Sequence, residues 1–158
     1  MLPGIKLFDL TGRVAIITGG SKGLGSAMAE GLASAGANLL LTSRNQDEVE
    51  ATAAQIQSDY GNKVIGMAAD VTDPDQVTAM TERAISEFGK IDILINNAGI
   101  NIRGPIDDIT LEEFQDVQNV NVTGPWLCVR SVVPHMKKAQ YGKIINLAST
   151  LGLVGMSN

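Results

Sequence analysis

The sequence predicts an α/β fold in which one parallel, doubly wound sheet is covered by helices on both faces. Short apolar runs rich in valine, isoleucine and leucine recur along the 158-residue chain, and a longer amphipathic segment separates each run from the next. The runs are apolar at successive positions, which is typical of strands that are buried on both faces. Right-handed helical crossovers between such strands favour a doubly wound sheet.

Five strands follow from these runs. We expect them at Val14–Ile17, Asn38–Leu41, Val64–Met67, Ile91–Ile95 and Ile144–Leu147. No linker, repeat or low-complexity tract interrupts the alternation, so we expect a single domain over residues 1–158.

The segments between the strands carry helix start signals. Asn45 is a candidate cap for a helix that runs to Tyr60. Asp73 precedes a proline at the first helical position and a glutamine three residues after the cap. Thr110 and Glu113 have the spacing of a capping box.

Two of these helices have a predicted apolar face. After Asp73, the side chains that repeat on one face are Val77, Met80, Ala84 and Phe88. After Thr110, we expect Phe114 and Val117 to point inward.

Composition narrows the class of partner. The net charge is -5 and no basic run is present, which argues against a nucleic-acid or anionic-membrane surface and favours a small soluble ligand. Cys128 is the only cysteine and has apolar neighbours, so we expect a core side chain in a protein of the reducing cytoplasm. No signal peptide, membrane span or metal site is expected.

A glycine-rich turn follows the first predicted strand and opens a helix. Gly19, Gly23 and Gly25 leave room for backbone N–H groups to approach a phosphate, and the dipole of the helix favours its charge. The stricter GxGxxG pattern is not met, because Met28 stands where it needs a glycine. A tight connection without a ligand is the alternative; the position of the turn after the first strand favours phosphate binding.

The end of the second strand indicates which dinucleotide is preferred. A free ribose 2′-hydroxyl is usually bound by an acid at this place, and a 2′-phosphate by an arginine. Ser43 and Arg44 stand here, and Lys22 lies in the glycine turn. NADP(H) is therefore favoured over NAD(H), with ordinary solvated surface charges as the alternative.

Two further residues are candidates for chemistry. Pro125 has no N–H, so the carbonyl of Asn121 loses its usual helical donor and is free to hold a water on a proton path; a simple helix kink is the alternative. Ser149 follows the fifth predicted strand, at the edge of the sheet where ligands of this architecture bind, and its hydroxyl can donate to a carbonyl oxygen; a loop serine without a role is the alternative.

From about Phe8 onward the chain resembles the short-chain dehydrogenase/reductase family, of the classical type. The motif TGxxxGxG is present at Thr18–Gly25, the NNAG motif at Asn96–Gly99, and the acid after strand three at Asp70. The resemblance implies a Rossmann fold, with Asn121 and Ser149 as active-site residues. The residues that it and the sequence pattern assign to the cofactor are Gly19, Ser21, Lys22, Gly23, Leu24, Gly25, Ser43, Arg44, Asp70, Val71, Asn97, Ala98 and Gly99.

The activity implied is hydride transfer between NADP(H) and a small alcohol or carbonyl substrate. The N-terminal half is most similar to sugar-acid members such as gluconate dehydrogenases, and 3-oxoacyl carrier-protein reductases are close competitors. The resemblance also implies a homo-oligomer, a dimer or tetramer, that pairs partly through the helix containing Asn121.

The catalytic tyrosine and lysine of the family, in a YxxxK motif, belong about a dozen residues beyond the serine. Tyr60 and Tyr141 are the only tyrosines, and neither has a lysine four residues later. We therefore expect the N-terminal portion of a longer enzyme, without the C-terminal part of the family fold, and an uncovered sheet edge at the fifth strand.

Two other functions are alternatives to an oxidoreductase. One is a truncated cofactor-binding module without turnover. The other is a different nucleotide-binding domain, such as a methyltransferase, which only the glycine turn supports.

Overall fold

A five-stranded parallel sheet forms the middle layer of the computed structural model, which describes residues 3–152 and 154. The strand order is β3-β2-β1-β4-β5, and every neighbouring pair is parallel. The order therefore changes direction between β1 and β4. The strands are β1 (Val14–Thr18), β2 (Asn38–Ser43), β3 (Val64–Ala68), β4 (Ile93–Asn96) and β5 (Lys143–Asn146). The predicted topology is confirmed, and the predicted strand bounds lie within two residues of these.

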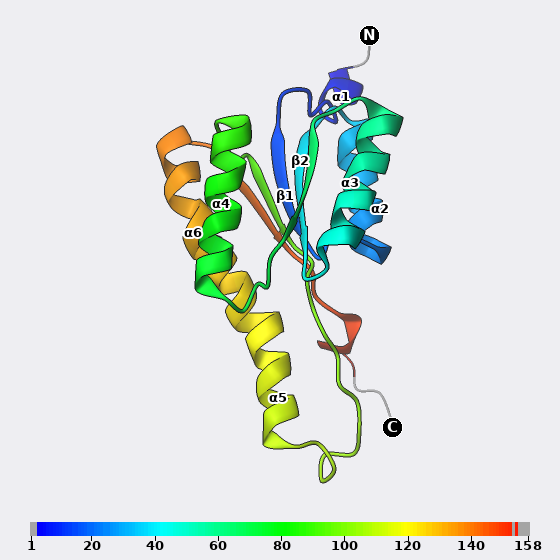
Figure 1. The fold of residues 1–158 in the computed structure, drawn as a ribbon, viewed down its shortest axis with the longest axis vertical. Helices are drawn as coiled ribbons and strands as arrows, with labels where there is room; N and C mark the ends of the chain where they lie inside the picture. The colour runs from blue at the N-terminus through cyan, green and yellow to red at the C-terminus, as the bar shows by residue number, and fades with distance from the viewer. Residues whose placement is uncertain (1–2, 153, 155–158) are drawn as a thin grey trace.

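Helices cover both faces of this sheet (Figure 1). One face packs against α2 and α3, and the other packs against α4 and α6. Side chains of β1 alternate between the two cores, because Ala15 and Ile17 face the first and Ile16 faces the second. The helical segments are α1 (Pro3–Lys6), α2 (Gly23–Ser34), α3 (Gln46–Tyr60), α4 (Pro74–Phe88), α5 (Leu111–Gln118), the π-helical η1 (Asn119–Thr123), α6 (Gly124–Ala139) and the short 3-10 helix η2 (Thr150–Gly152).

The predicted helix caps are confirmed. The Asn45 side chain accepts a hydrogen bond from the backbone N–H of Glu48. The Asp73 side chain accepts hydrogen bonds from the backbone N–H groups of Asp75 and Gln76 in the first turn of α4. Thr110 and Glu113 form the expected capping box. On α4, three of the four predicted apolar side chains are buried and Phe88 packs against them. Local sequence therefore determines where α3, α4 and α5 begin.

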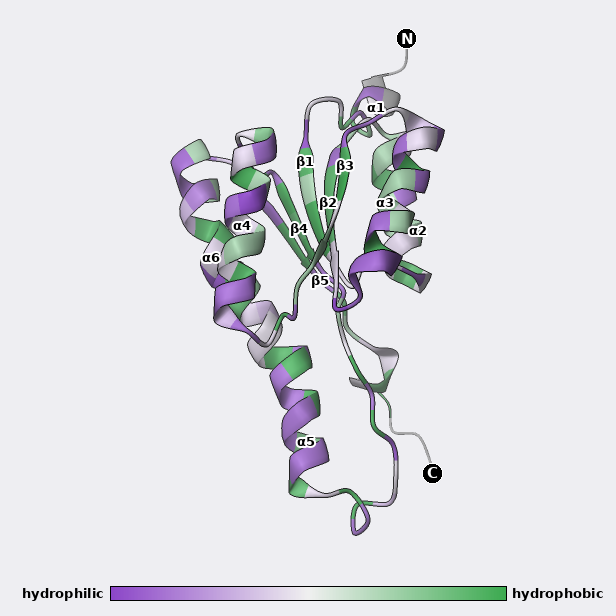
Figure 2. Cartoon of the chain, viewed as in Figure 1, coloured by the Kyte–Doolittle hydropathy of each residue, from purple (hydrophilic) through white to green (hydrophobic). Residues whose placement is uncertain are grey.

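One expectation about α5 is wrong. Phe114 does not point into a core, since it is 54% exposed, and Val117 is only half-buried. The reason is the position of the helix, because α5 extends beyond the edge of the sheet and has no layer to pack against (Figure 1). Most of its surface is polar, with isolated apolar positions (Figure 2).

β5 is an exposed edge strand in the described part of the chain. Ile144 and Ile145 are 37% and 48% exposed, although they pair with buried residues of β4. Among the described residues, β4 is the one strand that pairs with β5. Tyr141 lies in the loop before β5, at the end of the sheet opposite Ser149.

Asp92 joins three strands at the amino-terminal end of the sheet. Its carboxylate accepts hydrogen bonds from the Val14 backbone at 2.9 Å and from Arg13 at 2.8 Å, and pairs with Lys90 at 3.0 Å. Its backbone N–H donates to Val14 and its carbonyl accepts from Lys143, each at 2.9 Å. Burial raises the pKa of this carboxyl, but the hydrogen bonds from Lys90, Arg13 and Val14 outweigh burial and hold the pKa below its usual range.

We predict that Asp92→Asn lowers the free energy of unfolding at pH 7 by about 1–2 kcal/mol, because the charge-assisted contacts with Arg13 and Lys90 are lost. The loss is limited because Arg13 and Lys90 are half-exposed and remain hydrated. A depressed pKa contributes stability above the unfolded value of about 3.9 and loses it as pH falls toward the folded value. Urea unfolding between pH 2.5 and 7 should therefore show a smaller acid-induced loss in Asp92→Asn than in the wild type. Asp107→Asn, at an exposed loop position, is the control. Equal acid dependence of wild type and Asp92→Asn would contradict this role.

Candidate functional site

The loops after β1 and β4 are locked together by Thr18 and Asn97. The Thr18 hydroxyl accepts hydrogen bonds from the backbone N–H groups of Asn97 and Ala98, both at 3.1 Å. The Asn97 side chain donates to the carbonyls of Thr18 and Gly19, both at 2.9 Å. The predicted site residue Asn97 therefore uses its side-chain amide to hold the glycine turn in place.

The glycines of this turn have different roles. Gly19 and Gly23 have φ values of +65° and +59°, a region that favours glycine. A Cβ on Gly25 would collide with the carbonyl oxygen of Gly19 and lie 2.7 Å from Nδ2 of Asn97. We expected all three glycines to leave room for a phosphate. At Gly25 the protein's own backbone occupies that room, so this glycine is required by the packing of the turn.

The amino terminus of α2 lacks a side-chain cap. Lys22 occupies the N-cap position and makes no capping hydrogen bond, whereas α3, α4 and α5 are each capped by a side chain. The first N–H groups of a helix need acceptors, and the helix dipole makes this end attractive to an anion. The start of α2 is therefore suited to bind a phosphate group.

A cavity of about 360 Å³ lies beside this turn, at the carboxyl ends of the strands. This volume is within the usual range for small-molecule sites. The predicted cofactor residues that line it are Gly19, Ser21, Lys22, Ser43, Arg44, Asp70, Val71, Asn97, Ala98 and Gly99. Gly23, Leu24 and Gly25 do not line it. Residues that sequence reasoning missed are Asn45, Glu48, Ala69, Ile100 and Val120.

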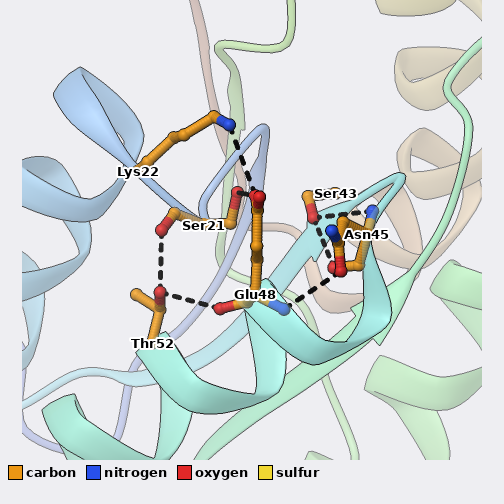
Figure 3. A network of polar contacts seen from close by, with 6 residues as sticks. All are labelled: Ser21, Lys22, Ser43, Asn45, Glu48 and Thr52. Atoms are coloured by element: carbon orange, nitrogen blue, oxygen red, sulfur yellow. Dashed lines mark hydrogen bonds and ion pairs between the residues drawn. The ribbon is translucent and has the colours of Figure 1, made fainter.

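The wall formed by α3 carries a polar network (Figure 3). The Lys22 ammonium lies 3.4 Å from the Glu48 carboxylate, and the Ser21 hydroxyl donates to the same oxygen at 3.5 Å. The Ser43 hydroxyl donates to the Asn45 carbonyl at 2.9 Å and accepts from the Asn45 N–H at 3.2 Å. Arg44 has no ion-pair partner among the described residues.

Asp70 is fixed on the opposite wall by the residues that follow it. Its carboxylate accepts hydrogen bonds from the backbone N–H of Thr72 at 2.9 Å and from the Thr72 hydroxyl at 2.7 Å. Its own N–H donates to the side chain of Gln76 at 2.9 Å. These contacts hold the loop after β3 against the start of α4, with Asp70 at the cavity.

A second cavity of about 690 Å³ adjoins the first, because Asn97, Ala98 and Gly99 line both. Asn121 and Ser149, the two predicted active-site residues, line this second cavity together. They come from different parts of the fold, since Asn121 lies in η1 and Ser149 follows β5. The structure therefore brings both to one place, next to the predicted cofactor residues.

The Asn121 side chain is held by the backbone of Ile100. Its carbonyl oxygen accepts from the N–H of Ile100 at 2.9 Å, and its amide donates to the Ile100 carbonyl at 2.8 Å. The helix around it is π-helical, and Pro125 four residues later has no N–H to donate to the Asn121 backbone carbonyl. The backbone carbonyl of Asn121 therefore lacks its α-helical donor, and the exposed side chain keeps one amide N–H that Ile100 does not use.

Ser149 has a hydroxyl that is oriented by its own loop. Its oxygen accepts a hydrogen bond from the N–H of Leu151 at 3.2 Å. The hydroxyl proton is not used in that bond. Ser149 can therefore donate to a group that enters the second cavity.

Cys128 takes no part in this site. It is fully buried in the core between the sheet and α6, and burial raises the pKa of its thiol to about 12. The prediction of a core side chain is confirmed. Among the described residues, no group of His, Cys, Asp and Glu side chains is arranged to hold a metal ion, and no helix has both the length and the hydropathy to cross a membrane.

Comparison with known proteins agrees with the fold and the motifs. Residues 13–158 match the family model described as short chain dehydrogenase, and the chain belongs to this family. It is 35% identical over 98% of its length to the 2-dehydro-3-deoxy-D-gluconate 5-dehydrogenase of Formosa agariphila. It is 38% identical over 93% of its length to the 3-oxoacyl-[acyl-carrier-protein] reductase of Vibrio cholerae.

A solved structure has the same fold. A short-chain type dehydrogenase/reductase from Mycobacterium marinum superposes with a TM-score of 0.93 and 38% identity over 98% of this chain. The chain spans 58% and 59% of the two curated relatives named above and 62% of that solved chain.

We predict that Gly25→Ala destabilises the protein, because its methyl group would meet the Gly19 carbonyl and displace the glycine turn. Gly31→Ala is a matched control in the same helix, where a Cβ meets nothing within 4 Å. The control should stabilise by up to about 1 kcal/mol through helix propensity, and Gly25→Ala should lower the free energy of unfolding by about 1–3 kcal/mol. Denaturant unfolding measures both. A neutral Gly25→Ala would show that the turn is looser than described.

Proposed function

We propose that the whole protein is an oxidoreductase that transfers a hydride between NADP(H) and an alcohol or carbonyl substrate. The observation that carries the proposal is the first cavity, where an uncapped helix start lies beside Ser43, Arg44 and Lys22. A dinucleotide needs an anion site for its pyrophosphate, and a 2′-phosphate needs cations at the end of β2. The residues present fit both needs, and the bound cofactor would supply the hydride chemistry.

Each wall of the first cavity has a proposed role. The turn before α2, at Gly19, Ser21 and Lys22, receives the pyrophosphate, and Ser43 and Arg44 receive the 2′-phosphate together with Lys22. Asp70 and Val71 bind the adenine. The turn formed by Asn97, Ala98 and Gly99 extends the binding surface toward the second cavity.

The second cavity is the proposed substrate side. Ser149 donates a hydrogen bond to the substrate oxygen, where negative charge develops during reduction of a carbonyl. Asn121 holds the loop at Ile100 by its side chain and offers its backbone carbonyl to a water that carries protons. Neither group has a pKa suited to deliver a proton near neutral pH.

The proton donor is therefore proposed to lie beyond residues 1–158, in a YxxxK segment of a longer chain. The shorter span of this chain relative to its relatives supports this proposal. The substrate class is proposed to be a sugar acid or a 3-oxoacyl thioester, in line with the names of two relatives at 35% and 38% identity, although relatives named for a hydroxysteroid and for D-threitol are as similar, at 39% and 36%. The second candidate function is a cofactor-binding module without turnover, and a turnover assay of the full-length gene product distinguishes the two.

The same proposal includes a cytoplasmic location and a homo-oligomeric state. The oligomeric state is supported by exposed apolar side chains along α5, η1 and α6, at Leu111, Phe114, Val122 and Trp126. A second copy of the chain would bury them. Sedimentation velocity tests this part, and a monomer at micromolar concentration would contradict it.

For the cofactor, we predict that NADPH binds more tightly than NADH and that Arg44→Ala weakens NADPH binding at least about tenfold, since a charge-assisted contact to the 2′-phosphate is lost. NADH binding should change little. Fluorescence titration of both cofactors measures this, with Arg103→Ala, outside the first cavity, as the control. Equal affinities of the wild type for the two cofactors would contradict the assignment.

For catalysis, we predict that Ser149→Ala lowers the kcat of the full-length gene product by about 10²-fold or more, the scale for losing a donor to a developing oxyanion. Ser58→Ala, on the exposed surface of α3, is the control and should leave kcat unchanged. Steady-state NADPH oxidation with candidate carbonyl substrates measures the effect. An unimpaired Ser149→Ala enzyme would place the chemistry on other residues.

A further inference from the structure

Glu48 is an acid inside a pocket whose other features favour an anion. It lies in the first turn of α3, and the Asn45 cap of that helix binds its backbone N–H at 3.2 Å. The backbone N–H of Asn45 donates to Ser43, so the Glu48 side chain takes no part in the cap. The carboxylate instead lines the first cavity, 44% exposed, beside the glycine turn (Figure 3).

This carboxylate engages two of the proposed cofactor contacts. Lys22 pairs with it at 3.4 Å, and the Ser21 hydroxyl points to the same oxygen. The neighbouring Thr52 hydroxyl has one proton to donate and lies 2.7 Å from the Ser21 carbonyl and 2.9 Å from the Glu48 carbonyl. The glycine turn is thereby tied to α3, and the ion pair has a defined place in the pocket.

The Lys22–Glu48 ion pair has opposite effects on the binding of a 2′-phosphate and of a 2′-hydroxyl. A 2′-phosphate carries more than one negative charge, so it competes with Glu48 for Lys22 and is repelled by the nearby carboxylate. A 2′-hydroxyl carries no charge and can donate a hydrogen bond to a carboxylate. Glu48 therefore weakens the contribution of Lys22 to 2′-phosphate binding.

We propose that Glu48 is a specificity-determining residue that lowers the preference of this pocket for a 2′-phosphate over a 2′-hydroxyl. The inference rests on the proposed function, because it concerns the adenosine end of the same cofactor site. It adds a residue outside the glycine motif and outside the Ser43-Arg44 pair. The preference between NADP(H) and NAD(H) then depends on two opposing contributions. The positive charges of Lys22 and Arg44 favour the 2′-phosphate, and the negative charge of Glu48 disfavours it.

The test uses two probes that differ only in the group at issue, adenosine 2′,5′-bisphosphate and adenosine 5′-monophosphate. Calorimetry on the purified full-length gene product gives the ratio of their dissociation constants. Glu48→Gln should raise the preference for the bisphosphate about tenfold, equivalent to about 1.4 kcal/mol. In a Lys22→Gln background the gain from Glu48→Gln should fall by at least half, because the released lysine is no longer present.

Asp47→Asn is the matched control. It removes the same charge from the same helix turn, but Asp47 does not line the cavity. The control should leave the ratio unchanged within twofold. Circular dichroism checks that α3 remains folded in each variant, as expected because Asn45 binds only the backbone of residue 48.

The outcomes separate this inference from the proposed function. A wild type without preference for the bisphosphate contradicts the proposed NADP(H) preference, yet a tenfold gain in Glu48→Gln still supports the role of Glu48. A wild type that prefers the bisphosphate, with the same ratio in Glu48→Gln, overturns the inference and leaves the proposed function standing. An equal gain in Asp47→Asn also overturns it, since the effect would then be a general change in charge.

Discussion

The site depends on the contact between the loops after β1 and β4, which the buried Thr18 and the Asn97 amide hold together. The strand order changes direction between these two strands, so the following helices diverge and leave space at the carboxyl ends. Polar backbone groups in this narrow place need partners, and Thr18 and Asn97 supply them. The same contacts fix the glycine turn, set the start of α2 and bring Ala98 and Gly99 to both cavities.

The distribution of helix caps explains where the fold accepts an anion. Side chains satisfy the first turns of α3, α4 and α5, while α2 starts at Lys22 without such a bond. A phosphate at α2 would take the place of a cap, and this links the stability of the fold to cofactor binding. The charges nearby are of both signs, so specificity depends on their balance.

Features that depend on neighbours in the chain were predictable from the sequence. The apolar runs located all five strands, and Asn45, Asp73 and Thr110 located three helix starts, because burial on both faces and capping both act over a few residues. The position of Ser149 at the carboxyl edge of the sheet also followed, since parallel strands end at the same edge. Phe114 was wrongly placed because nothing local shows that α5 extends beyond the sheet. The contacts of Gly25, Asn97 and Glu48 join segments far apart in sequence, and only the folded chain reveals them.

Hydrogen exchange of individual amides with and without NADPH tests most directly whether the cofactor binds at the β1–β4 crevice. Binding should slow exchange at Gly23, Leu24 and Gly25 in the first turn of α2, and at Ser43 and Arg44. The first turn of α5, already capped by Thr110 and outside both cavities, should exchange at an unchanged rate and serves as the internal reference. Unchanged exchange at the start of α2 in the saturated protein, or protection confined to another part of the surface, would contradict the proposed site.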